Sequence, residues 1–456
     1  MPLQKNQVLT LRVERLSSDG SGVAHSPDGE TVFIPGAAPG DEARVRIVKD
    51  CKRYAFGILD EVLTPSPDRI PVDCAVAGPC GGCSLRHLDY AAELRAKQEN
   101  VADAFARIGG LDVPVLPIVG SPEVNRYRNK VQFPVGVDKS GKPCIGFYAG
   151  RTHRIVPCPD CRLQPGVLNE IGNALCAFFA EKGIQPYSEE TGRGLVRHIF
   201  LRRGAHSGQI MVCLVCTRAR LPSAEELCTR LKAQFAEITT ILLNVNAKNT
   251  NVILGTETHT LYGPGYIEDT LCGVPVQLGP LSFYQVNTLA AEQLYGIAAQ
   301  YAQLTPDDLL LDLYCGIGTI GLSMAAHCRE LIGVEIVPEA IESAKANAAR
   351  MGTDVAAKSR FFCADAGQAA TRLAAEGLHP DIVMLDPPRK GCDEATLSAV
   401  VRMSPRRVVY VSCNPATAAR DAAWLEQNGY RAEKVQPVDL FPRTRHCECV
   451  LSLSKV

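Results

Sequence analysis

The sequence lacks any long hydrophobic run. No apolar stretch approaches the roughly 18 residues that would cross a bilayer. Residues 1–10 contain no apolar segment of the kind that forms a secretory signal peptide. A hydrophobic fraction of 46% beside a charged fraction of 21% also excludes a disordered or fibrous chain. We therefore expect a globular, cytoplasmic protein without a membrane partner.

A strong charge of either sign is missing as well. The formal net charge is −1, which gives no overall sign of a nucleic-acid partner. A basic surface can nevertheless coexist with an acidic one, and basic residues gather in three stretches, 44–53, 126–130 and 193–203. Each stretch could equally be ordinary solvated surface. Charge alone therefore leaves RNA binding open.

Cysteine, by contrast, is plentiful. The chain has 19 cysteines, an odd number in a long chain, which is a poor match for a disulfide framework. Cys74, Cys80 and Cys83 lie close together among glycines that permit a tight turn. A metal site needs a fourth ligand, and Cys158 and Cys161 are both candidates. The spacing alone permits either a structural zinc or an iron–sulfur cluster.

The 456 residues are too many for one ordinary core, and the pattern along the chain predicts three domains. Residues 1–63 contain short strands and no helical pattern, which predicts a small β-barrel of the OB kind, either an RNA platform or a plain structural barrel. A proline-rich hinge follows at 64–67. Residues 64–264 predict an α+β domain that carries the cysteine cluster. Residues 265–456 alternate strands and helices, which predicts a parallel α/β sheet.

A glycine-rich turn in the last domain predicts a nucleotide-type cofactor site. The apolar strand 309–313 leads into the sequence DLYCGIGTIG, in which glycines let backbone N–H groups approach a ligand. The next strand ends in Glu335, placed to accept both ribose hydroxyls of an adenosine. A third strand ends at Asp365, suited to the adenine edge.

The same glycine spacing is also compatible with a nicotinamide dinucleotide. Two features favour S-adenosylmethionine. Asp312 precedes the glycines, where a carboxylate is unhelpful beside a pyrophosphate but attracts a sulfonium or amino group. A fourth strand ends in the sequence DPPR, beginning at Asp386, for which a dehydrogenase has no evident use. We therefore predict S-adenosylmethionine at these strand ends.

A further strand, 407–411, leads to Cys413, which is followed by Asn and Pro. We expect this cysteine to point into the same crevice as Asp386. The 5-carbon of a pyrimidine is a poor nucleophile, but addition of a thiolate to the 6-carbon turns the ring into an enolate that accepts a methyl group. A base must then remove the proton from the 5-carbon. Cys413 is thus a candidate nucleophile.

Five motifs occur in a characteristic order, at 282–287, 312–321, 386–391, 411–417 and 446–448. Together they resemble the RNA uracil-5-methyltransferases, most closely the branch with a TRAM domain and an iron–sulfur cluster that modifies 23S ribosomal RNA. The resemblance covers nearly the whole chain. It implies a Rossmann-like methyltransferase domain, a TRAM barrel and an RNA substrate, with S-adenosyl-L-methionine as methyl donor.

The resemblance also implies roles for individual residues. Cys413 is the implied nucleophile, and Glu448 is the implied base that removes the proton. Residues implied to contact the methyl donor are Gln285, Tyr314, Glu335 and Asp386. Without the resemblance, Glu448 would be read as a solvated carboxylate.

For the cysteines, the resemblance implies a [4Fe–4S] cluster. Its implied ligands are Cys74, Cys80, Cys83 and Cys161, the last chosen by matching the segment 155–164. The additional Cys158 departs from the family pattern. Methyl transfer from S-adenosylmethionine needs no electron, so we expect a structural or RNA-positioning role for the cluster.

Other functions fit the motifs less well. A cytosine-5 RNA methyltransferase usually has a Pro-Cys motif where this chain has DPPR, and an adenine-N6 enzyme would have an aromatic residue in place of Arg389. A non-catalytic RNA chaperone on the same fold would not need Cys413 with Glu448. A uridine in the T-loop of tRNA remains an alternative substrate to 23S ribosomal RNA. No protein partner is indicated, and we expect a monomer.

Overall fold

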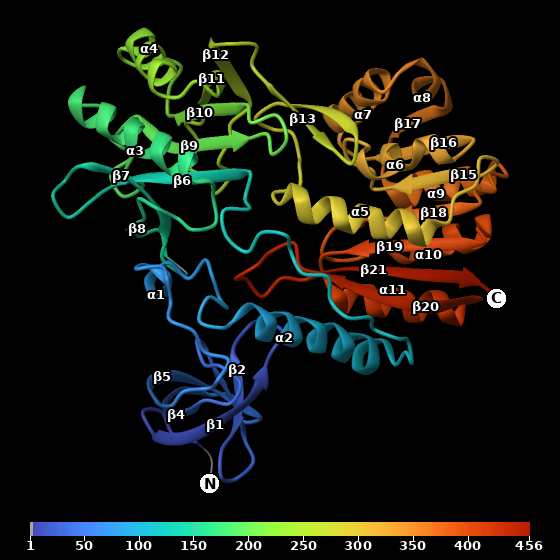
Figure 1. The fold of residues 1–456 in the computed structure, drawn as a ribbon, viewed down its shortest axis with the longest axis horizontal. Coiled ribbons are helices and arrows are strands. Elements are labelled where there is room, and N and C mark those ends of the chain that lie inside the picture. The colour runs from blue at the N-terminus through green and yellow to red at the C-terminus, as the bar shows by residue number, and fades with distance from the viewer. Residues whose placement is uncertain (1–2, 151) are drawn as a thin grey trace.

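The five N-terminal strands close into a small barrel, at the bottom of Figure 1. The structure is a computed structural model that describes residues 3–150 and 152–456. Around the barrel the order is β1-β2-β3-β5-β4. The bounds of the strands are β1 Val8–Leu16, β2 Gly22–His25, β3 Thr31–Ile34, β4 Glu42–Asp50 and β5 Tyr54–Thr64. Buried and exposed residues alternate along β4, as expected for a strand with one face in a core. The predicted N-terminal barrel is confirmed.

A seven-stranded mixed sheet forms the middle of the chain, at the upper left of Figure 1. Its order is β12-β11-β10-β9-β6-β7-β8. The bounds of its strands are β6 Lys130–Val137, β7 Pro143–Tyr148, β8 Ile155–Pro157, β9 Val196–Arg203, β10 Ile210–Cys216, β11 Ile238–Val245 and β12 Glu257–Tyr262. Helices α3 (Gly166–Glu181) and α4 (Ala224–Gln234) share one hydrophobic core with the sheet. A short helix, α1 (Ala77–Cys80), precedes this region.

The C-terminal part is a doubly wound α/β sheet of order β17-β16-β15-β18-β19-β21-β20. Six strands run in one direction, and β21 is antiparallel to both of its neighbours. The bounds of these strands are β15 Leu309–Leu313, β16 Glu330–Glu335, β17 Ser359–Cys363, β18 Ile382–Leu385, β19 Arg407–Ser412, β20 Tyr430–Val438 and β21 Glu448–Lys455. A separate hairpin, β13 (Ile267–Leu271) and β14 (Val274–Leu278), precedes the sheet.

Helices cover both faces of this sheet. Alternate residues of the strands enter two hydrophobic cores, one on each face. The bounds of the helices are α5 Thr288–Ala302, α6 Thr319–Met324, α7 Pro338–Arg350, α8 Thr353–Lys358, α9 Ala366–Ala375, α10 Glu394–Met403 and α11 Pro415–Gln427. Among the residues that the structure describes, no helix combines the length and the apolar character needed to span a membrane.

The strand order reverses between β15 and β18, which are neighbours in the sheet. In open α/β sheets, ligands bind outside the carboxyl ends of the strands at such a reversal. The glycine-rich segment 314–318 directly follows β15, and the DPPR sequence directly follows β18. The fold therefore brings both predicted motifs to one crevice.

Helix α2 (Tyr90–Asp103) connects the barrel to the edge of this sheet and continues as a short π-helix, η1 (Ala104–Gly109). Figure 1 shows α2 between the barrel and strands β20 and β21. A buried ion network fixes it there. Lys97, 1% exposed, places its Nζ 2.7 Å from Glu93 Oε1 and 2.8 Å from Asp439 Oδ1. The backbone N–H of Arg443 donates to Glu93 Oε1 at 2.7 Å. The loop between β20 and β21 is thus held to α2.

Removing the ammonium group of this network tests its contribution to stability. Lys97→Met removes the ammonium partner of the buried Asp439 and leaves Glu93 with the guanidinium group of Arg443, at 3.5 Å, so we expect a loss of about 3–5 kcal/mol in the free energy of unfolding. Denaturant unfolding followed by circular dichroism measures it. Arg95→Met is the matched control, because Arg95 lies on the same helix but its partner Asp68 is exposed. The control should cost less than about 1 kcal/mol. Equal losses in the two variants would contradict the role given to Lys97.

Candidate active site

Cys413 and Glu448 lie opposite each other on neighbouring strands. Strand β19 pairs antiparallel with β21, with Ser412 opposite Cys449. One residue further along this register, Cys413 is opposite Glu448 at the end of the strands. Glu448 is only 6% exposed, and Cys413 is half-buried. The structure therefore brings together the predicted nucleophile and the predicted base.

The Cys413 thiol lies between two carboxyl groups and one guanidinium group. Burial raises the pKa of this thiol, and the carboxylates of Glu448 and Asp386 raise it further. Arg389 acts in the opposite direction, through its positive charge and a hydrogen bond to the thiol. Because the thiolate is the nucleophilic form, Arg389 is the group that favours reactivity.

The role of Arg389 was missed in the sequence. Arg389 was used there only to exclude an adenine-N6 enzyme. Its side chain is exposed, and its carbonyl oxygen accepts hydrogen bonds from the side chains of Asn414 and Thr417. These contacts join the loop after β18 to the loop after Cys413. The sequence signal that could have revealed this role was a cationic residue directly after the two prolines that follow β18.

Both carboxyl groups near the thiol have raised pKa values. Burial raises the pKa of Glu448 to about 8, with Asp386 adding to the rise and Arg389 opposing it. Burial also raises the pKa of Asp386 to about 7. A general base is most effective when its pKa is near the working pH. Glu448 is therefore suited to proton abstraction at neutral or mildly alkaline pH.

Other thiols lie near the same strand ends but are buried. The buried thiols are those of Cys315, Cys392, Cys447 and Cys449. Burial raises the pKa of each of them. Cys413 is the more exposed thiol of this region and the one that Arg389 contacts. Cys413 is therefore the accessible thiol among these five.

On the other side of the crevice, Asp312 is buried near the end of β15, just before the glycine-rich turn. Its Oδ2 accepts a hydrogen bond from the backbone N–H of Gly321 at 3.0 Å. A Cβ at Gly321 would lie 2.8 Å from the same oxygen, so only glycine allows this approach. Oδ1 of Asp312 is buried without a partner, and burial raises the pKa of this carboxyl to about 8. An unpartnered acidic oxygen fits a cationic methyl donor.

Glu335 ends β16, as the sequence predicts. Its two oxygens accept hydrogen bonds from the backbone N–H groups of Gly316, at 3.2 Å, and Val337, at 3.0 Å. Its carboxylate is thus fixed beside the glycine-rich turn. Strand β17 ends at Cys363, two residues before Asp365. Asp365 instead forms the N-cap of α9 and accepts from the N–H of Gln368.

The two other predicted donor contacts also lie at this crevice. Tyr314 adopts a left-handed backbone conformation, with φ of 66°, at the start of the turn. Its hydroxyl lies 3.3 Å from Thr396 on α10, so this oxygen is already engaged. The side chain of Gln285 hydrogen bonds with Tyr295, whose pKa burial raises and the nearby charge of Asp386 raises further. Gln285 and Asp386 therefore both lie near Tyr295.

The cysteine cluster gathers thiols from two distant segments. Burial raises the pKa of Cys80, and the charges of Cys161 and Cys74 raise it further. Cys83 likewise interacts with Cys161 and Cys80. Cys158 hydrogen bonds with Cys161, which raises the pKa of Cys158 and lowers that of Cys161. All five predicted thiols are thus neighbours.

The second segment of this cluster is fixed by arginine. The guanidinium group of Arg126 donates to the carbonyl oxygens of Cys161, at 2.8 Å, and Gln164, at 3.1 Å. Within the described part of the chain, no group of three or more His, Cys, Asp or Glu side chains is arranged to hold a metal ion. The donor set is nevertheless thiol alone, the ligand type common to iron–sulfur clusters and structural zinc.

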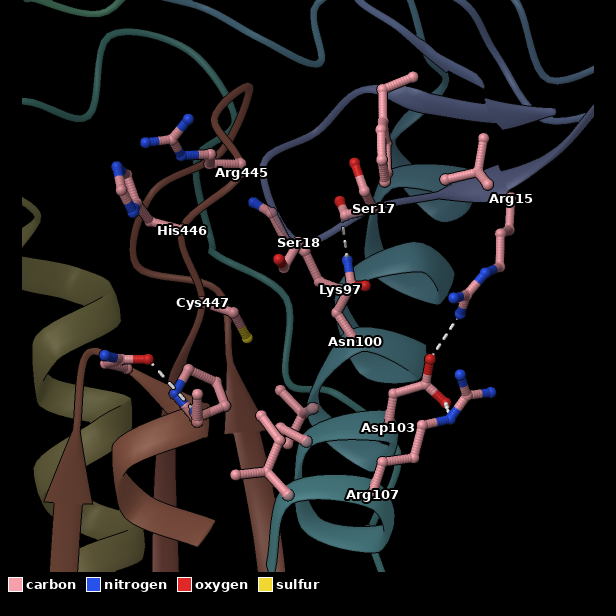
Figure 2. A pocket seen from close by; sticks show the side chains of 18 of the residues that line it. Arg15, Ser17, Ser18, Lys97, Asn100, Asp103, Arg107, Arg445, His446 and Cys447 are labelled. Atoms are coloured by element: carbon pink, nitrogen blue, oxygen red, sulfur yellow. Dashed lines mark hydrogen bonds and ion pairs between the residues drawn. The ribbon is translucent and has the colours of Figure 1, made fainter. Parts of the chain in front are cut away.

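A cavity of about 650 Å³ opens beside Cys413. Its walls come from the barrel, from α2 with η1, and from the loops before β21 and after β19. Figure 2 shows Arg15 and Ser17 of the barrel on one side, and Arg445, His446 and Cys447 on the other. The candidate nucleophile therefore faces a space that the barrel helps to enclose.

Comparisons with known proteins agree with this geometry. The family model of the tRNA (uracil-5-)-methyltransferases matches residues 207–456, and that of the TRAM domain matches residues 2–59. An uncharacterized RNA methyltransferase of Halalkalibacterium halodurans is 43% identical over 453 residues, 99% of this chain and 98% of the relative. One from Bacillus cereus is 41% identical over 456 residues, 100% of this chain and 98% of the relative.

A solved structure is similar over the whole length. The tRNA (uracil-54, C5)-methyltransferase of Pyrococcus abyssi, in complex with S-adenosyl-L-homocysteine, is 27% identical with a TM-score of 0.77. The match covers 98% of this chain and 100% of that structure. Since more than half of the chain matches the family model and full-length relatives exceed 40% identity, the chain belongs to the tRNA (uracil-5-)-methyltransferase family, whose members are S-adenosylmethionine-dependent RNA methyltransferases.

Proposed function

We propose that this enzyme methylates the 5-carbon of a uridine in 23S ribosomal RNA through a covalent adduct with Cys413. The observation that carries the proposal is the cross-strand placement of Cys413 opposite Glu448, at the crevice that also holds Asp312 and Asp386. A thiol and a carboxyl group on the same side of a pyrimidine ring supply both the attack and the later proton removal.

In this mechanism, Sγ of Cys413 as thiolate adds to the 6-carbon of uracil, and the electron pair of the 5,6 double bond moves to the ring enolate. The 5-carbon then takes the methyl group from the sulfonium of S-adenosylmethionine, which leaves as S-adenosylhomocysteine. The carboxylate of Glu448 removes the proton from the 5-carbon. The 5,6 double bond forms again, and the thiolate leaves. The protein ends the cycle with one more proton, on Glu448, which solvent removes.

Asp312 binds the methyl donor in this proposal. Its free Oδ1 lies near the end of β15, beside the glycine-rich turn, where a positive amino or sulfonium group would provide the missing partner. The carboxylate of Glu335, fixed by two backbone N–H groups, is placed for the ribose hydroxyls. Gln285, Tyr314 and Asp386 complete the proposed donor contacts.

Two RNA classes compete as substrate. The pairing of a TRAM barrel with a cysteine cluster supports 23S ribosomal RNA, as the resemblance in the sequence implied. The similarity to a tRNA (uracil-54, C5)-methyltransferase supports a tRNA T-loop uridine. We favour 23S ribosomal RNA because the five cysteines interact with one another, as they must in an enzyme that carries a cysteine cluster.

We further propose that Cys74, Cys80, Cys83 and Cys161 hold a [4Fe–4S] cluster. The backbone of Cys161 is fixed by Arg126 and by the side chain of Asn169, which donates to its carbonyl oxygen at 3.1 Å. The cluster would join α1 to the segment before α3 and so stabilise the central domain. Methyl transfer uses no electron from it.

Substituting the base should block release of the product. In Glu448→Gln the thiolate still attacks and the methyl group still transfers, but the 5-carbon proton stays, so a methylated RNA remains attached to the protein. We expect a denaturation-resistant band and turnover reduced by about a hundredfold or more. Cys413→Ala should give neither band nor product. Full activity of Cys413→Ala would contradict the covalent mechanism.

The trapped RNA also identifies the substrate. Sequencing the RNA held by Glu448→Gln expressed in cells should return a segment of 23S ribosomal RNA with the adduct at one uridine. Recovery of tRNA T-loops instead would overturn the ribosomal assignment and leave the mechanism intact.

Arg389 should lower the pKa of the nucleophile. Arg389→Gln removes the positive charge and the hydrogen bond at the thiol, so we expect the pKa of Cys413 to rise and the thiolate fraction at neutral pH to fall. The rate of iodoacetamide labelling of Cys413, measured across pH by mass spectrometry of its peptide, reports this change. Lys390→Gln, one residue along the same exposed loop, is the control. An unshifted profile in Arg389→Gln would contradict the assignment.

The metal content tests the cysteine assignment. Anaerobically purified protein should contain iron and sulfide in a ratio of about four to four. Cys161→Ser should lose both, and the matched variant Cys158→Ser should keep them. Stoichiometric zinc without iron would overturn the cluster, and the reverse pattern in the two variants would move the fourth ligand to Cys158.

A further inference from the structure

Three aromatic rings lie together on the outer surface of the barrel. Phe33 on β3 pairs with Phe56 on the parallel neighbour β5, and Tyr54 lies two residues before Phe56. The ring centroids are 5.7 Å apart for Phe33 and Tyr54, 5.8 Å for Phe33 and Phe56, and 5.6 Å for Tyr54 and Phe56. Val32, which precedes Phe33, and Ala55, which lies between Tyr54 and Phe56, are fully buried. The rings therefore point outward.

The barrel core does not contain these rings. It consists of smaller aliphatic side chains such as Val32, Val45 and Ile47. Tyr54 is 40% exposed, and Phe33 and Phe56 are half-buried. The barrel core therefore does not include these rings, which pack against one another on its surface. Exposed rings that touch edge to face leave part of their flat faces open to a ligand.

The aromatic surface is continuous with the cavity at the nucleophile. Phe33 lines the same cavity as Cys413, together with His25 and Thr31 of the neighbouring strand ends. Figure 2 shows this space between the barrel and the loop that carries His446. A chain that enters the site can thus reach the barrel without leaving the cavity.

The charge of the cavity fits a polyanion. Its lining includes four arginines, Arg15, Arg107, Arg389 and Arg445. Among the described lining residues, the single carboxylate is Asp103, and it is paired with both Arg15 and Arg107. The positive charge of Arg389 and Arg445 is therefore not cancelled by an acid of the lining. Basic walls with exposed aromatic rings are the combination that binds single-stranded RNA.

We infer that Phe33, Tyr54 and Phe56 form a stacking platform for unpaired nucleobases that flank the target uridine. This inference rests on the proposed function, because it concerns the same RNA. A uridine must leave its base stack before a thiol can reach its 6-carbon. Stacking of a neighbouring base on the platform compensates part of that cost. The arginines contact phosphates, and the rings hold bases regardless of their identity.

The experiment uses a single-stranded RNA that contains the target uridine and 2-aminopurine at flanking positions. The protein is the full chain, with its metal content intact. The variants are Phe33→Leu and Tyr54→Leu, which keep apolar bulk but remove a ring. Tyr54→Phe restores the ring, and Ile58→Ala changes an exposed side chain on the same face of β5 as a control.

We expect each leucine variant to bind the RNA about tenfold more weakly, which is about 1.4 kcal/mol and within the range of one base on one ring. The 2-aminopurine quenching seen with the wild type should diminish at one flanking position. The slope of affinity against salt should stay unchanged in these variants, because no phosphate contact is lost, whereas Arg445→Gln, which removes a lining charge that no acid of the lining cancels, should reduce it. Tyr54→Phe and Ile58→Ala should behave as the wild type.

Affinity for S-adenosylmethionine, measured by calorimetry, should be the same in all these variants, which shows that the C-terminal domain is folded, and unchanged circular dichroism melting curves show that the barrel is folded. Unchanged RNA affinity and quenching in both leucine variants would overturn the platform, including the case in which the rings bind a protein instead. A wild-type protein that neither binds nor methylates the RNA would overturn the proposed function itself. The two failures are therefore distinguishable.

Discussion

The arrangement of the active site depends on one buried ammonium group. Lys97 lies between the carboxylates of Glu93 and Asp439, and its charge joins α2 to the loop that precedes β21. Tyr90 extends the network, donating to Asp439 at 2.9 Å and accepting from the backbone of Ser121. Because α2 also faces the barrel, the same ion network relates the barrel, the cavity and the strand that carries the proposed base. Directional bonds among buried charged and polar groups specify one geometry more sharply than apolar packing does.

The site itself combines buried acids with a single nearby cation. Asp312, Asp386 and Glu448 all have raised pKa values because burial disfavours their charged forms. Among the described residues, no positive charge other than that of Arg389 acts on these three acids until a cationic methyl donor binds. Arg389 is the exception, and it acts on the thiol side of the crevice. The thiol therefore lies near carboxyl groups that raise its pKa and a guanidinium group that lowers it.

Local patterns in the sequence were sufficient for the fold. Strand alternation predicted the barrel, and alternating strands and helices predicted the parallel sheet, both of which are confirmed. The glycine-rich turn was correctly placed after β15, whereas the third strand ends earlier than expected and leaves Asp365 as a helix cap. Domain limits at 63 and 264 and the roles of the site residues stay predictions.

The placement of Cys413 opposite Glu448 could not be predicted from local sequence patterns. It arises because β21 enters the sheet antiparallel between β19 and β20, and pairing between distant strands leaves no periodic trace in the sequence. The burial of the neighbouring Cys447 and Cys449 follows from the same insertion. The burial of these two thiols determines which cysteine of the crevice reacts. Because Cys447 and Cys449 are buried beside the more accessible Cys413, an electrophile shaped like a pyrimidine would modify Cys413 and leave these two neighbouring thiols unmodified.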